Sequence, residues 1–199
     1  KEEGLCHPIL LGNDERIEKL AKELGLSLEG VEVVNLRHDR EAPRRGKFAK
    51  ILTEKRQRDG YTFEEANDKM FERNYFGMMM VETGEADACI TGLYTKYSNT
   101  IKVAKEVIGL KDGYNYFGTM HILNSKKGTY FIADTLINRS HDVESLKEIA
   151  RLTEQTVRFY NHEPVMAMVS YSNFGSDQGG SAGRVKTAVE QLQSENPDW

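Results

Sequence analysis

The stretch YFGMMMVETGEADACITGLYTKYSN, residues 75–99, decides the fold expected for this chain. It opens with an apolar stripe at helical spacing, made of Tyr75, Phe76, Met79 and Met80. Gly84 can end that helix, because glycine adopts a left-handed conformation without steric cost. Residues 86–90 are short, apolar and continuous, which predicts a strand covered on both faces. A helix, a tight turn and a buried strand in this order are typical of α/β proteins.

A glycine and a polar run follow the predicted strand and lead into the next helix. In an open α/β sheet, ligands bind at the carboxyl ends of strands. This loop is therefore a candidate binding loop, although a plain solvated loop fits its composition equally well. The candidate residues in it are Thr91, Gly92, Tyr94, Thr95, Lys96, Ser98 and Asn99.

The rest of the chain alternates strand and helix patterns, which predicts a three-layer α/β/α fold with a mostly parallel sheet. Strands are expected at 8–11, 31–36, 116–123, 129–134 and 165–170. Helices are expected at about 14–24, 47–58, 62–83, 101–109, 143–160 and 185–192. The polar turn at 124–128 predicts a hairpin. We expect one subdomain at 1–113, a second at 114–199, and a chain that is incomplete at both ends.

Composition excludes several classes of function. The chain has 199 residues, 39% hydrophobic and 29% charged, with a net charge of -4. This charge favours neither nucleic acid nor an anionic membrane, and no apolar run is as long as a membrane span. Cys6 and Cys89 are interpreted as small buried side chains beside strands. The absence of a disulfide framework and of a secretory signal predicts a cytoplasmic protein.

Two further stretches could hold a phosphate group. Residues 170–185, SYSNFGSDQGGSAGRV, join a strand to a helix, and small residues there would let a ligand approach a helix N-terminus. Residues 37–58 are strongly basic. The alternatives are a flexible loop and a solvated helix face, respectively. The five histidines form no metal-binding pattern, and no catalytic triad order is present.

The chain resembles the phosphate acetyltransferases over nearly its whole length. The resemblance rests on NYFGMMMVETGEADACITGL (74–93), FIADTLIN (131–138) and EPVMAMVSYSNFGS (163–176), with PILLGNDERIEKLAKELG and KRQRDGYTFEEA in support. SYSNFGS at 170–176 is most similar to the phosphotransacetylase-like domain of bacterial NADP-dependent malic enzymes. Active acetyltransferases typically have SYSTKGS there. Lys102 stands where the family usually has an arginine, and lysine lacks the bidentate fork.

The resemblance implies two subdomains with a ligand cleft between them. It also implies that the family's catalytic serine, arginine and aspartate lie outside this chain, so we assign no catalytic and no metal-binding residue here. NADP and a divalent metal, Mg²⁺ or Mn²⁺, are expected in a separate malic-enzyme domain. Three hypotheses remain: a regulatory and oligomerising domain that binds acetyl-CoA, an active phosphate acetyltransferase, and a scaffold without a ligand.

Under the first hypothesis, two loops face each other across the cleft and bind a CoA ester. Lys96 and Lys102 supply charge, hydroxyl and amide groups supply hydrogen bonds, and an aromatic ring packs on the pantetheine arm. The second loop contributes Ser172, Asn173, Phe174, Gly175 and Ser176, and Arg56 is added from the basic segment. The expected partners are acetyl-CoA or a related ester and a second copy of the chain. The surface expected for dimerisation combines the helix around residues 75–80 with the hairpin at 116–134.

Overall fold

The chain divides into two compact units, Lys1–Gly109 and Leu110–Trp199. The computed structural model describes residues 1–93, 95–173, 175–177 and 179–197. The first unit contains β1 (Ile9–Leu11), α1 (Asp14–Glu23), β2 (Glu32–Val34), the 3-10 turn η1 (Asp39–Glu41), α2 (Ala42–Arg56), the 3-10 turn η2 (Gln57–Asp59), α3 (Phe63–Lys69), α4 (Arg73–Glu82) and α5 (Tyr97–Val107). The second contains β3 (Met120–Ser125), β4 (Gly128–Ala133), α6 (Val143–Phe159) and α7 (Gly180–Glu195).

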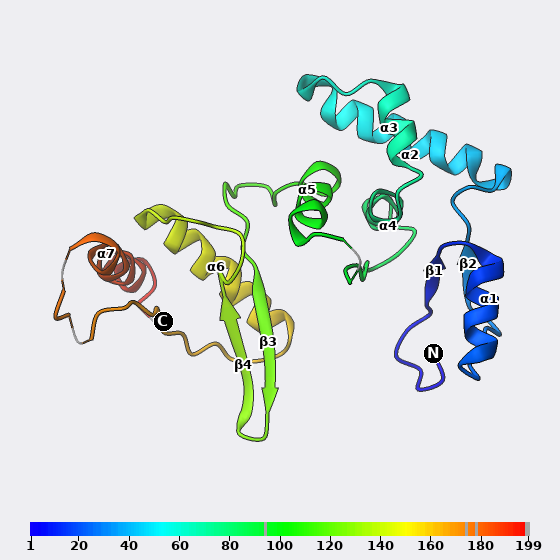
Figure 1. Cartoon of the computed structure of the whole chain (residues 1–199). Helices are drawn as coiled ribbons and strands as arrows, with labels where there is room; N and C mark the ends of the chain where they lie inside the picture. The colour runs from blue at the N-terminus through cyan, green and yellow to red at the C-terminus, as the bar shows by residue number, and fades with distance from the viewer. Residues whose placement is uncertain (94, 174, 178, 198–199) are drawn as a thin grey trace. The chain divides into compact units, whose positions relative to one another are not determined.

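In the first unit, β1 pairs with β2 in parallel, with Leu10 opposite Val33 (Figure 1). The connection through α1 is a βαβ unit. The Asn13 side chain caps α1, since it accepts a hydrogen bond from the Arg16 amide at 2.8 Å. Both strands are shorter than the sequence predicted, because the paired ladder covers only three residues of each.

The helices form where the sequence predicted them, but some of their ends differ from the predicted ones. Thr62 and Glu65 form a capping box at the start of α3. The helix predicted from Lys47 begins instead at Ala42, because Pro43 fits the first turn, where its missing N–H costs no hydrogen bond. The single helix predicted over 62–83 is divided into α3 and α4, with turns between them. The amides of Phe71 and Glu72 donate to the Asp68 and Lys69 carbonyls, three residues back, so turns replace the α-helical hydrogen bonds here.

The core of the first unit lies between β1–β2 and helices α2 to α5. Phe48 and Phe76 are fully buried and pack edge to face with their ring centroids 5.1 Å apart. Gly77 lets α4 approach β1 closely, because a Cβ there would lie 3.0 Å from both Leu11 Cδ1 and Cys89 Sγ. The expectation that residues 75–80 offer surface for dimerisation is wrong, because Tyr75 to Met80 are all buried.

The strand predicted at 86–90 is absent from the described residues. The amides of Glu85 and Ala86 both donate to the Met80 carbonyl, which completes the turn after α4. Gly84 has φ +73°, as expected for the end of a helix. Ile90 is fully exposed. A strand covered on both faces needs hydrogen-bonded neighbours, and β1 and β2 pair only with each other within the part of the chain described.

Two other expectations are also wrong. Residues 165–170 form no strand, and Val165 and Val169 are almost fully exposed. Cys6 is exposed because it lies in the segment that precedes β1, whereas Cys89 is partly buried against the core. The apolar run at 165–170 stays largely exposed because no strand pairs with it among the described residues.

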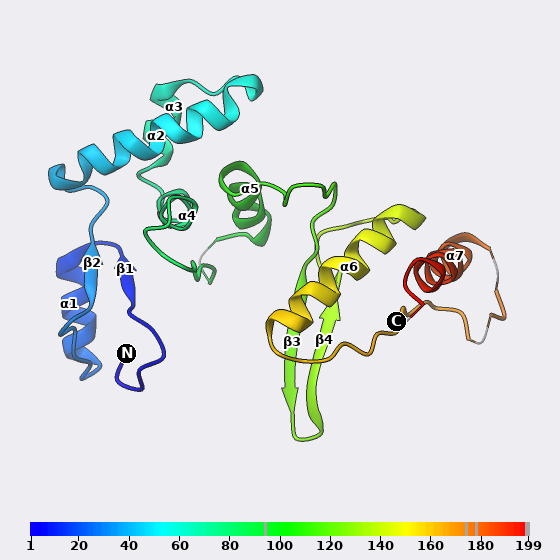
Figure 2. The same cartoon turned by 180° about the vertical axis from the view of Figure 1, so that it is seen from behind.

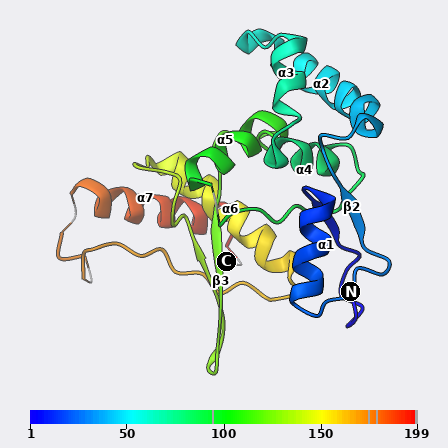
Figure 3. The same cartoon turned by 45° about the vertical axis from the view of Figure 1, so that its right-hand side comes forward.

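In the second unit, the predicted hairpin is confirmed. β3 and β4 pair antiparallel, and Lys126 and Lys127 form the turn between Ser125 and Gly128. Figure 2 shows α6 lying across the hairpin, and Figure 3 shows the hairpin extending beyond it. The buried ammonium of Lys147 joins α6 to α7 through Glu195 at 2.7 Å. No helix in the described ranges is long and apolar enough to cross a membrane.

Candidate functional site

The first candidate loop, residues 91–99, enters the N-terminus of α5. Gly92 and Leu93 both have positive φ, +142° and +63°, so the chain turns sharply here. Lys96 is the N-cap residue, its side chain makes no capping hydrogen bond, and the first turn of α5 contains no acidic residue. A helix N-terminus without a capping side chain, at the positive end of the helix dipole, therefore favours an anion.

Most of the residues predicted to bind a ligand in this loop are exposed. The hydroxyls of Thr95 and Thr100 lie 3.3 Å apart, and Thr91 donates a hydrogen bond to Asn74. Gly92, Lys96, Ser98 and Asn99 are exposed. Tyr94 lies outside the described residues. The structure thus brings hydroxyl, amide and ammonium groups together at one helix end.

Lys102 lies along α5 and is 64% exposed, with its ammonium 3.7 Å from Glu106. Glu106 also accepts a hydrogen bond from the Tyr75 hydroxyl. Burial alone would raise the pKa of Glu106, but hydrogen bonds from Tyr61 and Tyr75 and the nearby lysines lower it. Lys102 therefore forms a solvent-exposed ion pair with a carboxylate that stays charged at neutral pH.

Arg56 lies at the opposite end of α5 from the loop. Its Nε donates to the Glu106 carbonyl at 2.7 Å, and a second guanidinium nitrogen donates to the Lys105 carbonyl. These bonds cap the last turn of α5. The sequence predicted Arg56 as a ligand residue. In the structure its guanidinium bonds the last carbonyls of α5.

The other cations of the basic segment are also largely paired within the first unit. Arg45 donates to the Leu36 carbonyl at 2.6 Å, Lys47 lies 3.0 Å from Glu85, and Lys55 donates to the Val107 carbonyl at 2.7 Å. Such contacts stabilise the packing of α2 against its neighbours. These cations therefore have a packing role, which differs from both the phosphate site and the solvated helix face considered for this segment.

The second candidate loop precedes α7. The Asn173 carbonyl accepts a bond from the Ser176 amide at 3.0 Å, and Gly175 has φ +74°. The Ser172 hydroxyl accepts from the Asp177 amide at 3.0 Å and lies 3.4 Å from the Ser176 hydroxyl. Phe174 lies outside the described residues. These bonds shape a tight loop with two hydroxyls on one side.

A hollow of about 410 Å³ lies beside this loop, lined by Ser170, Ser172, Gly175, Asp177, Ala182, Val185 and Lys186. The hydrogen bond from the Tyr171 hydroxyl, and a weaker effect of the Gly179 amide, lower the pKa of Asp177. Its carboxylate is therefore charged next to the α7 N-terminus. A second anion is less favoured here than at α5.

One polar cluster has no clear signal in the sequence. Asp134 has φ +57°, lies 2.5 Å from His141, and accepts a hydrogen bond from Asn138 at 2.8 Å. The cluster holds the turn between β4 and α6. Its members are separated by several unrelated residues, so no motif identifies it. Among the described residues, no group of three or more His, Cys, Asp or Glu side chains could hold a metal ion.

Comparisons with known proteins give a consistent result. The family model "Phosphate acetyl/butaryl transferase" matches residues 1–199. The NADP-dependent malic enzymes of Salmonella typhimurium and Escherichia coli are 37% and 36% identical to this chain, which covers 26% of each. The phosphate acetyltransferase of Bacillus subtilis is 31% identical, and the chain covers 59% of it. Each match covers 98% of this chain.

Solved structures support the same fold. A phosphotransacetylase from Streptococcus pyogenes matches with a TM-score of 0.83 and 30% identity, over 100% of this chain and 60% of that one. The EutD phosphotransacetylase from Staphylococcus aureus has a TM-score of 0.74 and 26% identity, over 96% and 57%. The predicted α/β fold class and family resemblance are confirmed. The chain spans about a quarter of the malic enzymes and less than two thirds of the phosphotransacetylases.

Proposed function

Because the chain belongs to the phosphate acetyl/butaryl transferase family, we propose that it is the regulatory, phosphotransacetylase-like domain of an NADP-dependent malic enzyme. The observation that carries this proposal is the identity of 36–37% with two malic enzymes along almost the whole chain. The phosphate acetyltransferase of B. subtilis is 31% identical. The parent enzyme would oxidise malate with NADP and release pyruvate and carbon dioxide, with its metal and NADP bound by another domain.

The proposed ligand of this domain is acetyl-CoA or a related CoA ester. The loop at α5 fits the phosphate groups best, because it combines uncapped helix amides with Lys96 and, along the helix, Lys102. The loop before α7 offers hydroxyls and a charged carboxylate, which fit the neutral amides of a pantetheine arm better than a phosphate. That the two loops face each other stays a prediction.

Regulation requires that the ligand bind one state of the parent enzyme more tightly than another. Acetyl-CoA would then act at a distance from the malate site, without taking part in the reaction. We also propose that the domain forms homodimers. The outward face of the hairpin supports this, because Leu123, Tyr130 and Ile132 are each about half exposed.

The main competing function is acetyl transfer between phosphate and CoA, which the family name and several relatives support. That reaction needs a base for the thiol and cations for the departing phosphate. Arg56 is occupied in capping α5, and Lys102 lacks the bidentate guanidinium fork for a departing phosphate. We therefore expect no CoA-dependent consumption of acetyl phosphate by the purified full-length protein.

This expectation is checked by following thioester formation at the absorbance of the thioester bond. A purified phosphate acetyltransferase serves as the positive control. A rate well above that without enzyme, and proportional to protein concentration, would show acetyl transfer. The regulatory proposal would then be rejected.

A further inference from the structure

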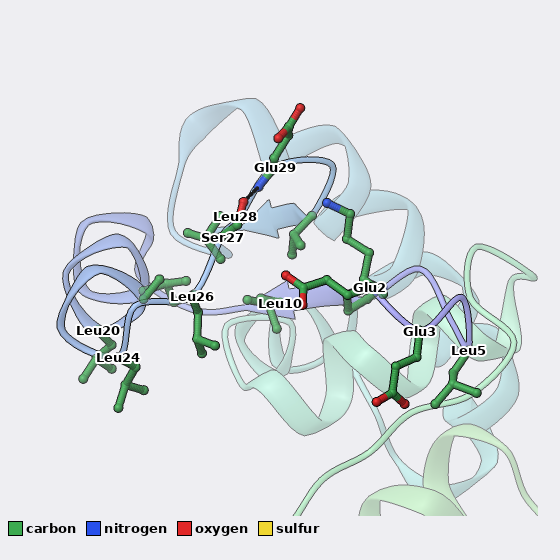
Figure 4. Close-up of a pocket in the computed structure, with 15 residues that line it drawn as sticks. Glu2, Glu3, Leu5, Leu10, Leu20, Leu24, Leu26, Ser27, Leu28 and Glu29 are labelled. Atoms are coloured by element: carbon green, nitrogen blue, oxygen red, sulfur yellow. Dashed lines mark hydrogen bonds between the residues drawn. The ribbon is translucent and has the colours of Figure 1, made fainter.

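The first candidate loop, residues 91–99, begins at a hydrogen bond to a residue that the sequence did not single out. The Thr91 hydroxyl donates to the side-chain oxygen of Asn74, the second residue of α4. Among the described residues, this is the only hydrogen bond that joins residues 87–96 to an element earlier in the chain. The contact is separate from the hollow beside α1 (Figure 4), whose lining residues all lie between Lys1 and Val31.

A packing contact places the same segment against α4. A Cβ added at Gly77 would lie 3.0 Å from Cys89 Sγ, so Cys89 packs closely on the helix there. Cys89 and Thr91 are two positions apart, and their partners Gly77 and Asn74 are three positions apart on α4. Residues three apart share one face of a helix. The segment that leads to the loop therefore follows one face of α4 towards its N-terminus.

Helix α4 is a firm support for this segment. Tyr75 to Met80, which follow Asn74 directly, are all buried, and Phe76 and Met79 have no exposed surface. Helices buried in a core are among the last parts of a protein to open. A side chain held by such a helix therefore has a fixed position from which the loop can start.

The loop itself has few other restraints. Gly92 and Leu93 turn the chain sharply directly after Thr91, and α5 begins at Tyr97. The far end of α5 is held by the Arg56 guanidinium. Residues that become ordered only when a ligand binds cost conformational free energy, so a loop that is already ordered binds more tightly.

We propose that Asn74 is a positioning residue for the ligand site at α5. Its side-chain oxygen fixes Thr91, and the fixed Thr91 orders the start of the loop before a ligand arrives. Asn74 acts through Thr91 and not by contact with the ligand. This inference rests on the proposed function, in which the loop at α5 binds the phosphate groups of a CoA ester.

The first test needs no ligand. NMR order parameters of the backbone amides of Gly92, Leu93 and Lys96 are measured in the full chain. Asn74→Ala should lower them from about 0.85, typical of a rigid backbone, towards about 0.6. Asn74→Asp keeps an acceptor for the Thr91 hydroxyl and should keep the wild-type values. The matched control is Asn67→Ala on α3, a partly buried asparagine whose side chain makes no hydrogen bond to the described residues.

The second test is calorimetry with acetyl-CoA on the same proteins. Asn74→Ala should bind about fivefold more weakly, as expected for the loss of one neutral hydrogen bond. The double variant Asn74→Ala with Thr91→Val should bind no more weakly than Thr91→Val alone, because both changes remove the same bond. Thermal melts followed by circular dichroism confirm that each variant is folded.

Three results would overturn the proposal. Unchanged order parameters in Asn74→Ala would show that the bond does not order the loop. Losses of affinity that add in the double variant would show that the two residues act separately. An equal loss in Asn67→Ala would show a general loosening of the helices. If acetyl-CoA does not bind the wild type, the proposed function is rejected, and the order parameters alone then decide whether Asn74 positions the loop.

Discussion

At the scale of single residues, the first unit is held by polar pairs that join segments distant in the chain. The Asp14 carboxylate accepts a hydrogen bond from Asn35 at 3.0 Å and contacts His38 at 2.7 Å. These contacts fasten the end of β2 to the start of α1. His38, and then Asn35, lower the pKa of Asp14 from 3.8 to about 2.

This shift predicts the acid stability of the first unit. A carboxylate whose pKa is lowered by folding stabilises the fold above its ordinary pKa of 3.8, and this contribution is lost as the pH falls towards about 2. The free energy of unfolding should therefore fall less between pH 4 and pH 2 in Asp14→Asn than in the wild type. Urea titrations at several pH values measure this, with Glu18→Gln as the exposed control on the same helix. Parallel curves for Asp14→Asn and wild type would contradict it.

Substitution of Arg56 should lower stability, whereas substitution of Lys96 should weaken ligand binding. Arg56→Ala removes the hydrogen bonds that cap α5 and should cost about 1–3 kcal/mol of unfolding free energy. Lys96→Ala removes an exposed side chain without a capping bond, so stability should change by less than about 0.5 kcal/mol. Its affinity for acetyl-CoA should fall by about tenfold. If Arg56→Ala were as stable as the wild type but did not bind acetyl-CoA, Arg56 would be a ligand residue after all.

At the scale of elements, the close approach of α4 to β1 depends on Gly77. Gly77→Ala would place a methyl group 3.0 Å from Leu11 and Cys89, and overpacking of this kind costs about 1–3 kcal/mol. Gly46→Ala is the matched control on α2, because nothing lies within 4 Å of its added methyl group. Helix propensity should make that control neutral or slightly stabilising. Denaturant melts of both variants test the difference, and equal stabilities would show that α4 can move away.

Local signals predicted the elements better than their pairing. The Asn13 cap, the Thr62 capping box and the hairpin at 124–128 were predictable because each depends on residues within a few positions of one another. The strands at 86–90 and 165–170 failed because an apolar run does not reveal which neighbour, if any, supplies its hydrogen bonds. The Arg56 bonds to α5 span 49 and 50 positions, so no local pattern reports them.

At the scale of the whole molecule, the family resemblance predicted more about the fold than composition and periodicity did. The family match and the TM-score of 0.83 confirm the α/β fold class inferred from the quoted motifs. The composition and periodicity alone indicated only an α/β protein with loops suited to an anion. The structure adds the charged carboxylate of Asp177 beside α7 and the absence of a side-chain cap at Lys96 before α5. Our proposal for the phosphate groups rests on this difference between the two loops.

The central claim is that acetyl-CoA binds this domain and changes the rate of malate oxidation by the parent enzyme. Calorimetry with acetyl-CoA on the full-length protein, paired with malate-dependent NADPH formation, tests it most directly. We predict saturable binding that lowers the rate, and affinities about tenfold weaker in Lys102→Ala and Asn173→Ala. The account is contradicted if acetyl-CoA fails to bind at millimolar concentration, or if it binds without changing the rate.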